Sequence, residues 1–169
     1  MKQEYINRLP QEIHLLVQKI ECHIDSEINV KVDESRPHRL ACEVDKHGAT
    51  ILTPNDGYFP EASVLHELLH IRRFCVNNVP RIFVCDSYQN WNPELESGLT
   101  YLDTNLEHFV IVPEEIEYRP DRKEYWDSRI CNKIEKFDLL NRDNQNQGFD
   151  ALIYWAFIHH VFQEDDLIN

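Results

Sequence analysis

The sequence predicts an α+β fold, in which a three-stranded, mostly antiparallel sheet packs on one helix and several further helices complete the chain. Three observations support this prediction. Apolar residues recur at three- and four-residue spacing in several long segments, as in amphipathic helices. Short stretches near the start of the chain alternate apolar and polar residues, as half-buried strands do. Pro, Gly and Asn stand at many of the segment boundaries, where turns and helix ends are expected.

The first expected helix covers about residues 4–24 and contains Pro10, which should kink or divide it. Three strands are expected next, at 28–32, 40–44 and 49–52. The second and third strands are joined by a short turn in which Gly48 can adopt a positive φ. Two neighbouring strands in a hairpin are antiparallel, and this connection is why a mostly antiparallel sheet is expected.

A second helix is predicted over 60–76, with Pro60 at its first position. After a short strand expected at 81–85, a third helix should begin at Asn92, a residue type that caps helix N-termini well. This helix is expected to end near Val110, because Pro113 lacks the N–H that would continue it.

The last part of the chain is predicted to form two helices. The first begins at Asp121, which with Glu124 has the spacing of a capping box, and buries a face made of Trp126, Ile130, Ile134 and Phe137. A polar loop over 141–148 then leads to an apolar helix at 149–162.

The chain has 169 residues and a hydrophobic share of 42%, enough for a real core without disulfide or metal staples. We therefore expect a single domain over residues 1–169. Within it we distinguish an N-terminal helix (1–27), a core (28–115) and C-terminal helices (116–169).

Charge and cysteine content limit the classes of partner. The chain has 17 Lys and Arg against 30 Asp and Glu, a formal charge of −13, which repels nucleic acid and attracts basic protein segments. No apolar run approaches the roughly 20 residues of a membrane span, so no membrane partner is expected. The five scattered cysteines, without a signal peptide, indicate reduced thiols in a cytoplasmic protein.

The sharpest motif is His66-Glu67-Leu68-Leu69-His70 within the second predicted helix. Residues four apart share one helix face, so His66 and His70 can direct their imidazole nitrogens at one zinc ion. Glu67 can then accept a proton from a zinc-activated water as that water attacks a carbonyl. The alternative is that both histidines are ordinary half-buried side chains and Glu67 a surface acid, but the strongly apolar helix around them favours metal.

A catalytic zinc usually takes a third protein ligand, and the next helix offers candidates. We predict Glu107, because an acid near the negative end of a helix, followed by an apolar run, needs a positive partner. Glu96 and His108 are the alternatives. Asp103, one turn before Glu107, can accept a hydrogen bond from a ligating histidine or be an exposed helix acid.

With these residues in place, the sequence resembles the gluzincin branch of HExxH zinc metallopeptidases, and most closely the compact bacterial ImmA/IrrE-type domains. The resemblance covers about residues 28–115, and its marks are the segment from Ala49 to Pro54, the HELLH motif, and the stretch Val110-Ile111-Val112-Pro113. It implies a zincin-like domain with zinc on His66 and His70. It also implies Glu67 as general base and cleavage of an intracellular regulatory protein.

The predicted function is therefore a cytoplasmic zinc metallopeptidase that hydrolyses peptide bonds of a specific protein through a metal-activated water. Two alternatives stay open at the level of sequence. One is a catalytically silent binding or regulatory module with a zincin fold, and the other is a zinc hydrolase acting on a small amide.

Overall fold

The computed structural model describes residues 1–35, 39–45, 48–80, 88–135 and 145–162, with the backbone alone over 145–149. The chain divides into two compact units, Met1–Gln89 and Asn90–Asn169. Helices and a small sheet are both present, which confirms the predicted α+β class. The single domain and its inner boundaries stay a prediction, as does the zincin-like identity of the fold. The expected short strand at 81–85 lies outside the described residues.

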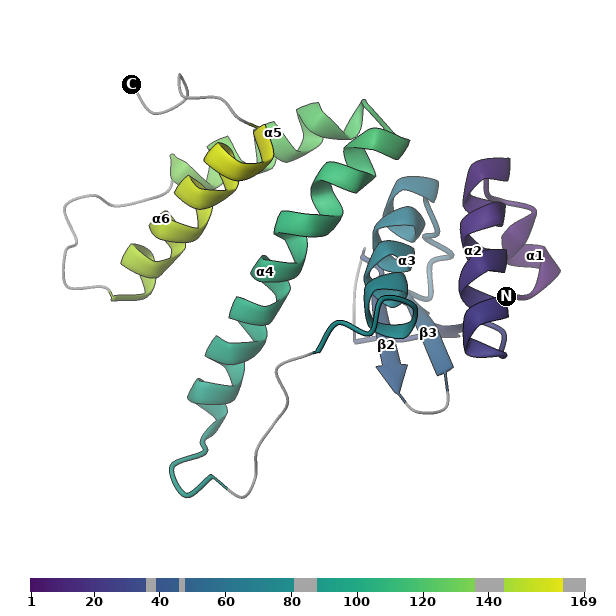
Figure 1. Cartoon of the computed structure of the whole chain (residues 1–169), viewed down its shortest axis with the longest axis horizontal. Coiled ribbons are helices and arrows are strands. Elements are labelled where there is room, and N and C mark those ends of the chain that lie inside the picture. The colour runs from purple at the N-terminus through teal and green to yellow at the C-terminus, as the bar shows by residue number, and fades with distance from the viewer. Residues whose placement is uncertain (36–38, 46–47, 81–87, 136–144, 163–169) are drawn as a thin grey trace. The chain divides into compact units, whose positions relative to one another are not determined.

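The described part of the first unit contains three helices and the sheet (Figure 1). The elements are α1 (Gln3–Ile6), α2 (Gln11–Ile24), β1 (Asn29–Val32), β2 (Ala41–Asp45), β3 (Gly48–Thr53) and α3 (Glu61–Cys75). The predicted break at Pro10 is confirmed, because this residue is extended, with φ −71° and ψ 160°, and caps α2. Pro60 is likewise extended and is the N-cap of α3, so this helix begins at Glu61, one residue later than predicted.

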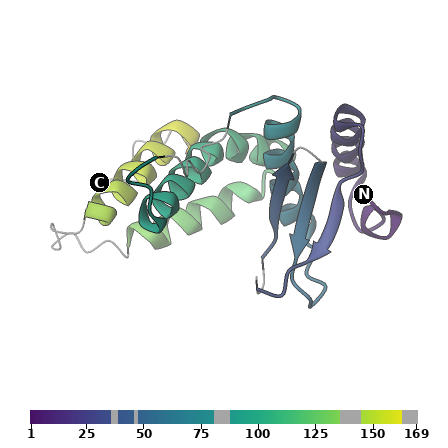
Figure 2. The same cartoon turned by 90° about the horizontal axis from the view of Figure 1, so that it is seen from below.

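The three strands run side by side in the order β1-β3-β2 (Figure 2). β2 and β3 form the predicted antiparallel pair, with Asp45 opposite Gly48, whose φ of 136° few other residues adopt. β1 pairs with β3 in parallel, with Asn29 opposite Thr50. The sheet is therefore mixed rather than mostly antiparallel. The reason is that β3 lies between the other two strands and pairs with both. Its residues are largely buried, which suits a central strand.

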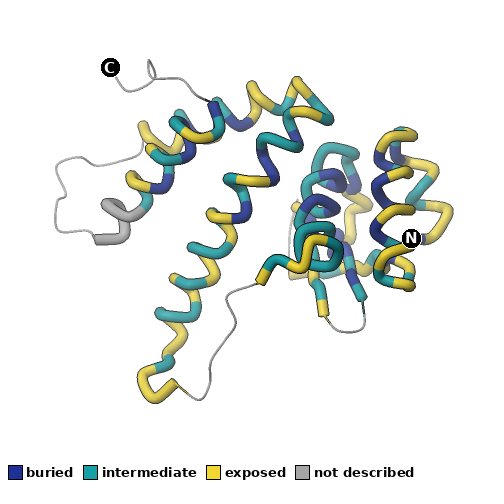
Figure 3. The backbone as a smooth tube through the Cα atoms, viewed as in Figure 1, coloured by how far each residue is buried: buried dark blue, intermediate teal, exposed yellow. Residues whose placement is uncertain are grey.

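The core of the first unit lies where α3 packs against α2 and the sheet, and the buried turns of both helices are visible in Figure 3. α3 buries one broad face at helical spacing: Val64, Leu65, Leu68, Leu69 and Ile71, each 0% exposed. α2 contributes Ile13, Leu16, Val17 and Ile20. This packing fixes the rotation of α3 about its axis and thereby the direction of the side chains on its other face.

The second unit is helical, with α4 (Pro93–Tyr118), α5 (Arg122–Ile134), α6 (Gln145–Phe157) and a π-helix, η1 (Ile158–Phe162). The predicted cap of α4 is confirmed, since the Asn92 side chain accepts a hydrogen bond from the Leu95 N–H at 2.9 Å. Its predicted end is wrong, because the helix continues through Pro113 to Tyr118. Proline removes one helical hydrogen bond. Burial of Ile111 and Val112 on the same stretch offsets that loss.

α5 begins where predicted, but not with a capping box. Asp121 has helical dihedral angles and makes no side-chain cap. Its carboxylate instead accepts hydrogen bonds from Arg119, at 3.0 Å from Nε and 3.2 Å from Nη2. Of the predicted buried face, Trp126 and Ile130 are buried and Ile134 is 36% exposed, while Phe137 lies outside the described residues.

The last predicted helix begins earlier than expected. α6 starts at Gln145, inside the segment predicted as a loop, and its predicted C-terminal turns are the π-helix η1. In the described part of the chain, every helix falls short of the length and apolar character that a bilayer crossing requires.

Candidate metal centre

The His66-Glu67-Leu68-Leu69-His70 motif lies in the middle of α3. The two leucines belong to the buried face that packs on α2 and the sheet, as predicted. His66, Glu67 and His70 are half-buried on the opposite side. Because successive helical residues are about 100° apart, the two histidines project about 40° from each other, with Glu67 about 60° beyond His70. The structure thus gathers all three predicted motif residues on one side of one helix.

The two imidazole rings adopt a definite arrangement. Their centres are 5.0 Å apart and their planes make an angle of 85°. The His70 ring also stacks on Phe74 one turn later, at 6.3 Å and 13°. An aromatic neighbour of this kind restricts the rotation of the His70 ring about its side-chain bonds.

This ring arrangement fits a bound zinc ion. Two imidazoles on one tetrahedral zinc, at Zn–N distances of about 2.0–2.1 Å, place their ring centres roughly 5 Å apart. The observed separation of 5.0 Å matches that value. Imidazole nitrogens are ligands of the kind zinc prefers, and Glu67 offers a carboxylate beside the two rings.

The predicted third ligand, Glu107, lies on α4 in the second unit. Its side chain is 5% exposed, which confirms the predicted burial of an acid at this position. Glu107 stands in line with Ile111 and Glu115 at four-residue spacing, so this line is the buried edge of α4. The role of Glu107 as a ligand stays a prediction, since it and the two histidines belong to different units.

The alternative ligand Glu96 has a local role. It lies in the first turn of α4, where an acid complements the helix dipole, and it accepts a hydrogen bond from the Trp91 indole N–H at 3.4 Å. Asp103 is half-buried on the same helix. The helix dipole and the Trp91 indole account for the position of the Glu96 carboxylate without a metal ion, so Glu96 is the weaker candidate ligand.

The alternative ligand His108 is half-buried and follows Glu107 directly. Its ring lies against the indole of Trp126 on α5, with ring centres 5.4 Å apart and planes at 57°. This contact lies entirely within the second unit. It gives His108 a defined neighbour on α5, which sequence reasoning did not anticipate.

Glu115 is a buried acid that the sequence prediction missed. Its side chain is 0% exposed, and it accepts hydrogen bonds from Arg122 Nε at 2.5 Å and Trp126 Nε1 at 3.1 Å. The signal was present, because Glu115 follows Glu107 by two helical turns. Because the helix was expected to end near Val110, Glu115 was not placed on the same helix face as Glu107.

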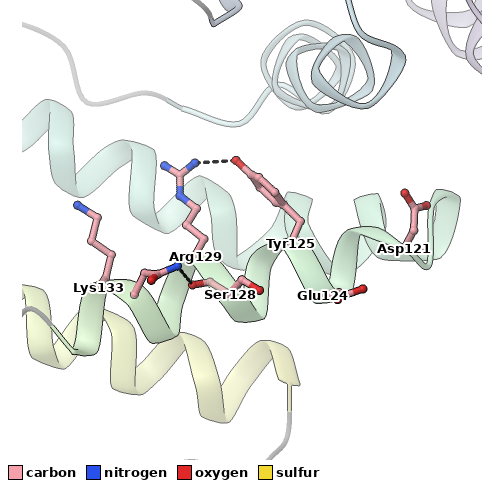
Figure 4. A pocket seen from close by; sticks show the side chains of 7 residues that line it. Asp121, Glu124, Tyr125, Ser128, Arg129 and Lys133 are labelled. Atoms are coloured by element: carbon pink, nitrogen blue, oxygen red, sulfur yellow. Dashed lines mark hydrogen bonds between the residues drawn. The ribbon is translucent and has the colours of Figure 1, made fainter.

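α5 also bears an open hollow of about 930 Å³ (Figure 4). Its lining residues come from this helix and the residue before it: Asp121, Glu124, Tyr125, Ser128, Arg129, Asn132 and Lys133. The Arg129 guanidinium in it donates a hydrogen bond to the Tyr125 hydroxyl oxygen at 3.1 Å. A hollow lined by one exposed helix face lacks the enclosure that small-molecule sites usually have.

No protein-family model, curated protein or solved structure matches this chain. Function is therefore inferred from the side chains of α3 and α4.

Proposed function

We propose that this chain is a zinc-dependent peptidase in which His66 and His70 hold the ion and Glu67 is the general base. The observation that carries the proposal is the pair of imidazole rings one turn apart on α3, with centres 5.0 Å apart. That spacing suits two ligands of one zinc ion. The general base follows the first ligand in sequence and shares its side of the helix.

A bound zinc ion supplies a water of lowered pKa and an electrophile for the scissile carbonyl. The residues of the chain do the rest. Glu67 accepts the proton of the attacking water and then delivers it to the amine that leaves. Its half-buried position limits competing solvent around the carboxylate. Leu68 and Leu69 anchor the motif in the core, so that the histidines need little reorganisation when metal binds.

The third ligand is proposed to come from the α4 turn that holds Glu107 and His108. Glu107 is the candidate that sequence reasoning favours, and it is a buried carboxylate, a group that zinc accepts as a ligand. His108, the next residue on this turn, stays the alternative that the sequence offers. Glu96 is less favoured, because its carboxylate already accepts a hydrogen bond from the Trp91 indole.

The proposed substrate is a peptide segment of a cytoplasmic protein. The formal charge of −13 favours a segment that carries Lys or Arg and disfavours nucleic acid. A carboxylate-rich surface raises the local concentration of such a segment without fixing the bond that is cut. Specificity would come from the side chains around the scissile bond.

Metal content tests the first part of the proposal. Protein purified without chelators should contain about one equivalent of zinc, and His66→Ala or His70→Ala should lose most of it, since two ligands of a three-ligand site cannot hold the ion tightly. His23→Ala, an exposed histidine on α2, is the matched control and should keep its zinc. Less than about half an equivalent in the wild type, unchanged in His66→Ala, ends the zinc proposal.

Hydrolysis tests the second part. Glu67→Gln should keep its zinc but lose about 100-fold or more in the rate of peptide hydrolysis, because the amide cannot accept the proton. The control is Glu12→Gln, an exposed acid on α2. Equal rates in Glu67→Gln and wild type remove Glu67 as the base. Zinc binding with capture of a protein partner but no hydrolysis indicates a binding module, and turnover of small amides alone indicates an amidase.

A further inference from the structure

The first half of α4 carries leucines at the spacing by which one helix packs along another. Leu95, Leu99, Leu102 and Leu106 follow one another at intervals of four, three and four residues. At about 100° per residue, their side chains fall within an arc of about 60° around the helix. Alternating intervals of three and four residues are the pattern of a helix–helix seam. We call these four residues the leucine stripe.

The leucine stripe lies outside the buried part of α4. All of residues 93–106 are described and none of them is buried, and Leu106 is 51% exposed. The buried residues of this helix begin at Glu107, and dark blue turns appear only in its later part (Figure 3). Ile111, one of these buried residues, projects about 140° away from Leu106. The stripe is therefore an apolar surface on a side of α4 that its buried residues do not share.

A hollow of about 470 Å³ lies on this stripe. It is lined by Asn92, Glu94, Leu95, Gly98, Leu99 and Leu102. Residues 95, 98, 99 and 102 stand at i, i+3, i+4 and i+7, and four neighbours of this kind form the hole into which a facing helix inserts a side chain. Gly98 keeps the hole deep, since a Cβ added there would meet no atom within 4 Å. The hollow thus has the form that a side chain from another helix fits.

The charges of α4 indicate which kind of helix fits best. The whole helix has seven acidic residues and no Lys or Arg. Glu96 follows Leu95 directly and Asp103 follows Leu102, so both acids flank the leucine stripe on the same side. A second copy of the chain would bring like charges together along the seam, which opposes self-pairing. A helix with Lys or Arg beside its apolar residues is attracted instead.

We propose that the leucine stripe is a docking surface for an amphipathic helix of a partner protein. That helix places one large apolar side chain in the hole over Gly98, and its Lys or Arg side chains lie along Glu96 and Asp103. The surface belongs to the second unit alone. The inference goes beyond the proposed function, because docking of a helix requires neither zinc nor hydrolysis.

Fluorescence anisotropy of labelled peptides on the full chain tests the proposal. The probe is a helical peptide of about 21 residues, with Leu at the seam positions of each heptad and Lys beside them. One comparison peptide has the same residues in scrambled order, and another has Glu in place of every Lys. The probe should bind at least about 10-fold more tightly than either, because only the probe combines the apolar face with the opposite charge.

Two variants remove the surface in different ways. Leu99→Glu puts a charge into the leucine stripe, and Gly98→Gln fills the hole with a residue that favours helix more than glycine does. Each should weaken binding of the probe by about 10-fold or more. The matched control is Leu15→Glu on α2, at a leucine that is 60% exposed, and it should bind the probe as the wild type does. Circular dichroism on each variant separates loss of folding from loss of affinity.

Several outcomes overturn the proposal. One is equal affinity for the three peptides, and another is unchanged binding of the probe in Gly98→Gln and Leu99→Glu. A wild type that sediments as a dimer, with Leu99→Glu as a monomer, identifies a second copy as the occupant of the stripe. A wild type that does not bind the probe, with a large loss of stability in Leu99→Glu, identifies the first unit of the same chain as the occupant.

The zinc variants separate this inference from the proposed function. His66→Ala should bind the probe as tightly as the wild type, whatever its zinc content. Loss of probe binding in His66→Ala would place the peptide at the motif on α3 and overturn the inference. Failure of the probe to bind leaves the zinc content and the hydrolysis measurements as they are, so that either proposal can fail while the other stands.

Discussion

At the scale of single residues, Glu115 illustrates how a buried charge is tolerated. Its carboxylate has no exposed surface, yet both oxygens accept hydrogen bonds, one from the Arg122 guanidinium and one from the Trp126 indole. Desolvating a carboxylate costs several kcal/mol, and only such complete pairing offsets the cost. The three side chains connect α4 to α5 across the helix turn at residues 119–121. Removing one of them leaves the others unsatisfied.

We therefore predict that Glu115→Ala lowers the free energy of unfolding by about 3–5 kcal/mol, since it leaves the Arg122 charge and the Trp126 N–H without their partner. Urea unfolding followed by Trp fluorescence measures the change. Glu124→Ala removes an exposed acid from α5 and should stay within about 0.5 kcal/mol of the wild type. Similar values for the two variants would contradict the stabilising role of the buried pair.

Asp121 shows the opposite case, a carboxyl at the surface. The Arg119 guanidinium hydrogen-bonds it and holds the pKa of this carboxyl below its ordinary value. A lowered pKa in the folded state stabilises the fold above the carboxyl's ordinary pKa, and this contribution is lost as the pH falls through the lowered value. Because the group is exposed to solvent and salt, the effect on stability is small.

The corresponding prediction concerns titration. In Arg119→Ala the pKa of Asp121 should rise toward the ordinary value for aspartate, because the hydrogen bonds from the guanidinium are gone. NMR titration of the Asp121 side-chain carbon measures it. The shift should shrink as salt is added in the wild type. An Asp121 pKa that is identical with and without Arg119 would mean that the pairing does not persist in solution.

At the scale of elements, α3 has two functions on two faces. One face supplies core residues, and the other presents the two histidines and the glutamate. The same apolar residues that hold the unit together therefore also set the direction of the two histidines and the glutamate. A change on the buried face should first appear as lost stability.

Leu69→Ala should lower the free energy of unfolding of the first unit by about 2–5 kcal/mol, because it opens a cavity beneath the motif. Leu69 is 0% exposed. Leu15→Ala is the matched control, since this leucine of α2 is 60% exposed and should change stability little. Denaturant unfolding of both variants gives the comparison. Equal stability of the two would mean that α3 does not pack as described.

Most elements were predictable because their signals are local. The break at Pro10, the cap at Asn92 and the three strand positions follow from residues within each segment. The errors have two causes, burial by tertiary packing in one case and competition between local hydrogen-bond donors in the other. The helix passes Pro113 because burial of Ile111 and Val112 outweighs one lost hydrogen bond. Asp121 turns to Arg119 instead of capping α5, a choice between two nearby donors that spacing alone does not rank.

At the scale of the whole molecule, the sequence signal for the candidate site is local in the first unit and is not local in the second. His66, Glu67 and His70 form a local motif, and helical geometry alone gathers them. A third ligand from α4 depends on tertiary structure, which spacing along the chain does not encode. The Trp126 contact to His108 likewise joins two helices and had no sequence signal. The burial of Glu107 was predictable because an apolar run follows it.

The charge of the whole chain leads to a prediction about binding. With a formal charge of −13, the Glu67→Gln variant should bind a Lys- and Arg-containing peptide more weakly as salt rises from roughly 0.05 to 0.5 M, because screening shortens the reach of surface charge. Fluorescence anisotropy of a labelled peptide measures the affinity. A neutral peptide of the same length is the control and should show little salt dependence. Identical slopes for both peptides would remove charge as a source of preference.

The order of strands in the sheet also bears on how the chain is made. Among the strands that the structure describes, the outer two, β1 and β2, each pair with β3, which the ribosome produces last of the three. During synthesis the first two strands therefore emerge before their hydrogen-bonding neighbour in this sheet. They can pair fully only after Thr53, the last residue of β3, has left the exit tunnel. A nascent chain interrupted before Gly48 would therefore carry two unpaired backbone ribbons, the condition in which chaperones or wrong partners capture them.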